Sequence, residues 1–326
     1  MKYTQHALNV LTAKSFQGIG NAWIFKNMQK NIPEEQIITL LKVHEETFYR
    51  KRAEIEKQVN QLEGYCDGFV AIGDAQFPSH RGNVKTASEC PNVLFYRGDL
   101  DLLSLKHLNI AVIGVLTPDY STQEEEKKIV SLLVEYNAVI VSGLAFGCDE
   151  IAHRQTMQSN GATVAVLPSP LNDIQPAKNK ELAHEIVRTG GLLVTEYYQP
   201  ASNRYEIINR YVERDRLQAL FSDCVVLSSS YRPDSMDESA VKIDSGSRHA
   251  MDKAKEYGIQ RAVIYHDKYA HNPKYDLNRQ MMQENAVVRI DAENPNQDIF
   301  KICTKQLGLM EKQSGTSVPI QEGFSF

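Results

Sequence analysis

The sequence has few cysteines, no long apolar run and no excess of positive charge. Its five cysteines are scattered and form no C-x-x-C pair, so neither a disulfide framework nor a thiolate zinc site is expected. No run of about 18 apolar residues and no signal-peptide pattern is present, so we expect a cytoplasmic protein without membrane contact. Because the net charge is −5, nucleic-acid binding would require positive charge that is concentrated locally.

Motifs of common cofactor and metal enzymes are missing too. There is no G-x-x-x-x-G-K-[ST] loop, which excludes ATP hydrolysis of the P-loop type, and no G-x-G-x-x-G dinucleotide fingerprint. The zinc motif H-E-x-x-H is absent, and neither Ser142 nor Cys148 has an evident catalytic triad around it. We therefore expect no cofactor, no metal and no catalysis. Cleavage of a small nucleotide by Glu196 or Asp149 is the least favoured hypothesis.

The order of apolar segments predicts a small helical domain followed by an α/β domain. Residues 1–65 have helical spacing, with one long helix expected from Thr39 to Leu62. From Asn109 onward, short β-branched runs alternate with helical stretches, which predicts a Rossmann-like, doubly wound, mostly parallel sheet. A short helix, Asp298–Leu307, and a flexible tail should follow, so the expected domains are 1–65, 66–290 and 291–326. Strands are expected at 69–72, 93–98, 109–114, 138–142, 162–167, 192–195, 223–228 and 261–265.

A glycine-rich segment between an expected strand and an expected helix, residues 141–153, is the strongest candidate site. Gly143 and Gly147 let the backbone approach a ligand closely, and free N–H groups at a helix N-terminus attract anions. The alternative is an ordinary strand–helix connection that binds nothing. Asp149 and His153 share a helical face. We expect Asp149 to cap the helix and His153 to be bonded inside the pocket wall.

This segment resembles the S-G-L-A-x-G-x-D-x-x-A-H signature of the DNA-processing protein A (DprA/Smf) family. The family implies a single-stranded DNA-binding protein that loads RecA during transformation, acts as a dimer and is not an enzyme. Apolar residues near the last expected strand offer a dimer surface, although a core strand explains them equally well: Ile264, Met281, Met282, Val287 and Val288. Further segments that resemble family motifs follow in order at 161–167, 179–182, 190–197, 211–217, 222–227 and 245–247.

The resemblance and the positions at strand ends together give a set of candidate site residues. The carboxyl ends of parallel strands are where ligands bind on such sheets. The expected pocket wall consists of Phe146, Asp149, His153 and Glu196. The expected DNA or phosphate contacts are Gly114, Ser142, Gly143, Gly147, Asn179, Arg210, Arg214, Arg216, Ser245, Gly246, Ser247 and Arg248.

Two of these groups carry open alternatives. Three arginines within seven residues, Arg210, Arg214 and Arg216, suit bidentate phosphate contact, or form a solvated helix face paired with nearby carboxylates. The resemblance favours DNA contact. Glu196 either accepts a hydrogen bond from a ribose or base, or holds a neighbouring arginine.

The chain also departs from the family where ligand is expected to bind. Leu116 and Phe146 stand at positions where the family has arginine, and Asp215 replaces an asparagine. These changes favour an alternative function, in which a nucleotide- or signal-sensing domain has lost DNA binding.

The N-terminal domain has one candidate DNA contact of its own. The tripeptide Gly18-Ile19-Gly20 between two expected helices resembles the hairpin of a helix-hairpin-helix or SAM-like module, which presents backbone N–H groups to a phosphate. A helix C-cap followed by a turn is the alternative. Only Lys14 and Lys26 flank it.

Overall fold

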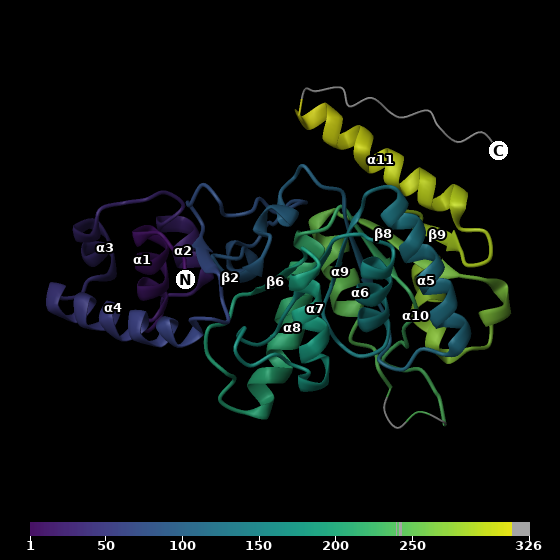
Figure 1. The fold of residues 1–326 in the computed structure, drawn as a ribbon, viewed down its shortest axis with the longest axis horizontal. Helices are drawn as coiled ribbons and strands as arrows, with labels where there is room; N and C mark the ends of the chain where they lie inside the picture. The colour runs from purple at the N-terminus through teal and green to yellow at the C-terminus, as the bar shows by residue number, and fades with distance from the viewer. Residues whose placement is uncertain (239, 241–242, 315–326) are drawn as a thin grey trace.

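The computed structural model describes residues 1–238, 240 and 243–314, apart from the side chains of 309–314. The N-terminal region is helical as predicted and lies at one end of the molecule beside β2 (Figure 1). The predicted helix from Thr39 to Leu62 is wrong, because Lys42 takes a left-handed φ of 57° and separates two helices. The break lets both helices pack against the first one. The helices are α1 (Gln5–Lys14), α2 (Asn21–Asn27), α3 (Glu34–Leu41) and α4 (Glu45–Val59).

After the N-terminal helices, the described residues form a nine-stranded sheet flanked by helices, with the strand order β1-β2-β6-β5-β4-β3-β7-β8-β9. The seven strands from β6 to β9 are parallel, and β1 and β2 add an antiparallel edge. This confirms the Rossmann-like prediction, and every predicted strand is present. The strands are β1 (Gly68–Ala71), β2 (Val93–Gly98), β3 (Asn109–Ile113), β4 (Val139–Ser142), β5 (Thr163–Val166), β6 (Leu192–Thr195), β7 (Cys224–Leu227), β8 (Gln260–Tyr265) and β9 (Val287–Asp291).

Helices cover both faces of the sheet because successive apolar side chains along each strand point to opposite faces, so that both faces are apolar. Along β3, Ala111 and Ile113 face the core under α8 and α9, whereas Ile110 and Val112 face the core under α5 and α11. The last helix, α11, is longer than the predicted Asp298–Leu307. It therefore includes the first residues of the predicted flexible tail, and the rest of that tail lies outside the described residues. The helices are α5 (Tyr120–Glu135), α6 (Cys148–Gln158), α7 (Lys180–Arg188), α8 (Arg204–Leu220), α9 (Arg248–Tyr257), α10 (Asp276–Met281) and α11 (Asn296–Ser314).

The apolar residues that the sequence offered as a dimer surface belong partly to the core. Ile264 and Met281 are buried, with 1% and 4% of their surface exposed, so they are not free to meet a partner. Val287 and Val288 lie in β9, as the core-strand explanation expected, and are half-buried. None of the helices in the described residues is both long and apolar enough to cross a membrane.

Candidate functional site

The glycine turn after β4 is closed by an internal carboxylate. The Asp149 carboxylate accepts hydrogen bonds from the backbone N–H groups of Gly143 (3.1 Å) and Ala145 (3.2 Å). The prediction that Asp149 caps α6 is therefore wrong, since its side chain serves the preceding turn and Gly147 is the N-cap residue. Two of the N–H groups that were expected to face a ligand already have a partner. The Ser142 hydroxyl also turns inward and donates to the Val112 carbonyl.

Gly143 lies directly against an arginine side chain. A Cβ atom at Gly143 would lie 1.5 Å from Nη1 of Arg214, so any side chain there would force the guanidinium to move. That guanidinium is buried, with Nη1 3.8 Å from Asp149 and 3.5 Å from Asp215. Burial raises the pKa of Asp215 to about 7, and Arg214 offsets only part of this rise. The turn, Asp149 and Arg214 thus form one buried unit.

His153 is buried and hydrogen-bonded, as predicted, and its place in a pocket wall stays a prediction. Its ring is buried and its Nδ1 lies 2.7 Å from the Thr163 hydroxyl, which itself donates to the Ile140 carbonyl. Burial, reinforced by Arg214, lowers the pKa of His153 to about 3, so the ring is neutral at physiological pH. It therefore ties α6 to β5.

The arginines of α8 are held in internal ion pairs. Arg216 donates two hydrogen bonds to Glu196, at 2.7 and 2.9 Å, which decides the open question about that carboxylate. Burial acts to lower the pKa of Arg216, but Glu196 outweighs it, so the pKa is raised. Arg210 pairs with Glu206 and stacks over Tyr197 at 4.1 Å. The alternative of a helix face paired with carboxylates is confirmed for Glu206 and Asp215. Its solvation is wrong, because all three arginines are at most 8% exposed. Their contact with phosphate stays a prediction.

The turns after β3 and before α9 pack against the glycine turn. Gly147 has a φ of 71°, and a Cβ there would lie 2.4 Å from the Val115 carbonyl. The Ser247 hydroxyl donates to the Gly114 carbonyl, and the Leu116 N–H donates to Asp244. Ser245 and Gly246 complete this turn, and Arg248 begins α9. The structure thus brings these predicted residues together at the carboxyl edge of the sheet.

An exposed group beside the glycine turn was only partly foreseen. Asn179 donates to the carbonyls of Leu144 and Ala145, which attaches the start of α7 to the turn. Its neighbours Lys178 and Lys180 are exposed and make no ion pair in the described part of the chain. Phe146 is 37% exposed at the tip of the same turn. The lysines were missed, although the Lys-Asn-Lys tripeptide that overlaps the start of the N-x-x-L motif was a usable signal.

A buried carboxyl group lies beneath this edge. Glu126 of α5 is fully buried, and burial raises its pKa to about 8, offset only in part by the Cys148 thiol and the Ser228 hydroxyl. The side chain is therefore largely protonated at neutral pH.

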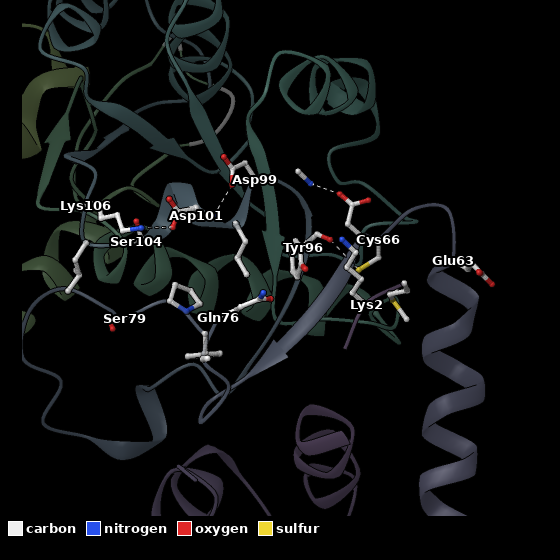
Figure 2. A pocket seen from close by; sticks show the side chains of 18 of the residues that line it. Lys2, Glu63, Cys66, Gln76, Ser79, Tyr96, Asp99, Asp101, Ser104 and Lys106 are labelled. Atoms are coloured by element: carbon white, nitrogen blue, oxygen red, sulfur yellow. Dashed lines mark hydrogen bonds and ion pairs between the residues drawn. The ribbon is translucent and has the colours of Figure 1, made fainter. Parts of the chain in front are cut away.

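A cavity of about 1220 Å³ lies at the opposite edge of the sheet (Figure 2). It is lined by the end of β2, where Gly98 pairs with the first residue of β6, and therefore faces away from the glycine turn. Its walls carry four carboxylates and only two lysines, which does not favour a phosphate. Those residues are Glu63, Asp67, Asp99, Asp101, Lys2 and Lys106.

Comparisons with known proteins point to one family. A family model described as DNA recombination-mediator protein A matches residues 68–299. The chain is 29% identical to DNA processing protein DprA of Streptococcus pneumoniae over 215 residues, which is 60% of this chain and 74% of that protein. It is 33% identical to Protein Smf of Escherichia coli over 110 residues, which is 34% of this chain and only 29% of that protein.

Solved structures show the same fold. The X-ray structure of DNA processing protein A from Streptococcus pneumoniae matches with a TM-score of 0.67 and 23% identity, over 92% of this chain and 98% of that one. DNA processing protein A from Helicobacter pylori, described with a single-stranded DNA binding mode, matches with a TM-score of 0.52 and 23% identity, over 70% of this chain and 96% of that one.

Proposed function

Because the chain belongs to the DNA recombination-mediator protein A family, we propose that it binds single-stranded DNA at the carboxyl edge of its sheet. The exposed group on and beside the glycine turn carries this proposal, because Phe146 offers a ring on which a base stacks while Lys178 and Lys180 attract the backbone. An aromatic platform beside cations is the usual arrangement in proteins that bind single strands without sequence preference. In this proposal the DNA strand is bound and not cleaved.

The buried unit around Arg214 has a positioning role in this proposal. Asp149 and Arg214 fix the glycine turn, and Asn179 attaches the lysines to it. The Ser245–Arg248 turn borders the same edge. In this proposal the DNA phosphates contact the exposed lysines, and the buried residues Asp149, Arg214 and Asn179 fix the position of the surface.

Replacing Lys178 and Lys180 together with glutamine is expected to weaken oligo-dT binding at least tenfold at low salt. Each lost phosphate contact should also lower the slope of log affinity against log salt by about 0.7. Fluorescence anisotropy at several salt concentrations measures both quantities. Replacing Lys30 and Lys106 with glutamine changes the net charge equally at distant exposed positions and is the matched control. Equal effects of the two double variants would contradict the proposed interface.

Two single variants test the same surface from opposite sides. Phe146→Ala should weaken binding through lost stacking while leaving the salt slope unchanged. Leu116→Arg should tighten binding and steepen the slope, because the Leu116 side chain is 44% exposed at the same edge. If no oligonucleotide binds but a small nucleotide raises the melting temperature, the result would instead support a nucleotide-sensing domain that has lost DNA binding.

We also propose that the protein acts as a homodimer and delivers single strands to a RecA-type recombinase. Family membership supports both ideas, and the half-buried Met282, Val287 and Val288 remain as candidate contacts. Light scattering at tens of micromolar is expected to give twice the 36.9 kDa of one chain. A monomer at that concentration would exclude the dimer. A pull-down with recombinase on single-stranded DNA tests the second partner.

A further inference from the structure

A second cavity, of about 570 Å³, lies where the N-terminal helices meet the sheet. The end of α1, the start of α2, the segment after β6 and the helices α8 and α9 all contribute to it. Cavities at such junctions are common ligand sites. Its lining includes Lys14, Tyr197, Tyr198, Arg210, Glu213 and Arg216.

One lysine of this cavity has no carboxylate partner. Four cationic side chains and three carboxylates line it, and a fourth carboxylate, Glu206, pairs with Arg210 from outside the lining. Arg216 pairs with Glu196, and Lys253 pairs with Glu89. Lys14 has no carboxylate within ion-pair distance among the described residues, and its amine donates only to the Asn21 side-chain oxygen, at 2.9 Å. Burial lowers the pKa of Lys14. An added anion would therefore compensate this amine.

Two tyrosine rings give the cavity an aromatic wall. Tyr197 is held in place because its hydroxyl donates to Glu213 at 2.6 Å and its ring lies under the Arg210 guanidinium. Tyr198 stacks on Phe95 with ring centroids 5.6 Å apart. Rings fixed in this way lose little freedom when a base packs against them.

The cavity lies on the same edge of the sheet as the proposed DNA surface. Tyr197 and Tyr198 directly follow the carboxyl end of β6, and Lys178 and Lys180 belong to the connection that follows β5. Strands β4, β5 and β6 are adjacent, so these features stand in sequence along one edge. The tripeptide Gly18-Ile19-Gly20 borders the cavity, since Asn21 directly follows it and lines the cavity. A DNA strand that runs from the glycine turn toward β6 would therefore reach this cavity next.

We propose that this cavity binds one nucleotide of the DNA strand, with a phosphate at Lys14 and the base against Tyr197. The proposal rests on the proposed function. A free nucleotide offers the same chemistry, and the two sources are separated by using oligo-dT and dTMP as probes.

Lys14→Gln is expected to weaken binding of an oligo-dT of about 20 nucleotides at least fivefold and to lower the salt slope by about 0.7. Lys14→Arg should preserve the slope, and Lys26→Gln, an exposed lysine of the same helical region, is the control. If Lys14→Gln does not fold, Tyr197→Leu should lower affinity without changing the slope. No Lys14-dependent binding of dTMP at millimolar concentration is expected.

The outcomes separate the cavity from the surface beside the glycine turn. If Lys14→Gln and Lys26→Gln bind oligo-dT alike, the cavity proposal is overturned while the proposed function stands. If the wild type binds no oligonucleotide, the proposed function fails. In that case, Lys14-dependent binding of dTMP would show that the cavity is a site for a free nucleotide. If dTMP does not bind either, the cavity proposal is overturned as well.

Discussion

Replacing Gly143 with alanine is expected to lower the free energy of unfolding by about 3–5 kcal/mol, the range for disrupting a buried ion pair. The added methyl group would overlap the Arg214 guanidinium, which is itself buried and would have to move away from the turn. Moving it would leave Asp149 as a buried carboxylate without its cation. Urea denaturation of the wild type and the variant gives the difference.

Gly246→Ala is the matched control for this prediction. It adds the same methyl group to a neighbouring turn, where the nearest atom to the new Cβ is an Asp244 oxygen at 3.7 Å. Adding Arg214→Ala to Gly143→Ala should cost much less than the sum of the two single effects, since both changes disrupt the same contact. Additive effects would show that the clash with Arg214 is not the cause.

Glu126→Gln is expected to stabilise the protein relative to wild type by an amount that grows with pH. The carboxyl group keeps its proton in the folded state up to a pKa of about 8, whereas its usual value is 4.5. Between these values the folded state binds more protons than the unfolded state, so wild-type stability falls by about 1.4 kcal/mol per pH unit from this group. The advantage of the glutamine variant should approach roughly 5 kcal/mol by pH 8.

Urea denaturation at pH 5, 6.5 and 8 measures this growth. His153 titrates the opposite way, because its lowered pKa costs stability as the pH falls below its usual value of 6.5. Since His153 is present in both proteins, its effect cancels in the difference. Glu124→Gln, at an exposed position of the same helix, should run parallel to the wild type. A Glu126→Gln curve that also runs parallel would show that Glu126 is ionised in the folded state.

The departures at the edge of the sheet suggest how the protein would bind DNA with fewer family arginines. Leu116 and Phe146 leave apolar surface exposed there, and the free cations stand on the neighbouring connection, at Lys178 and Lys180. Binding would therefore depend more on stacking and less on salt than binding through arginines would. The variants proposed above separate these two contributions.

Local patterns in the sequence determined the architecture and the place of the glycine turn. Short β-branched runs such as 109–114 and 138–142 predicted their strands correctly, because a short continuous apolar run is a local signal of a strand buried on both faces. The segment 141–153 located the glycine turn because it too is a local signal. One local pattern misled, since the helical spacing across Lys42 gave no sign that α3 and α4 would separate to pack against α1.

Only the tertiary structure decided what each charged group does. The Arg216–Glu196 pair joins residues 20 apart in sequence, and the Lys253–Glu89 pair joins residues 164 apart. Neither spacing favours a pair over a phosphate contact. Likewise, Gly143, Asp149 and Arg214 could be named from the sequence. The sequence did not show that the Asp149 carboxylate bonds to the turn or that the Arg214 guanidinium lies against the glycine. Charges find partners across the whole fold, because a buried ion is stable only beside a counter-ion, and the folding of distant segments chooses which one.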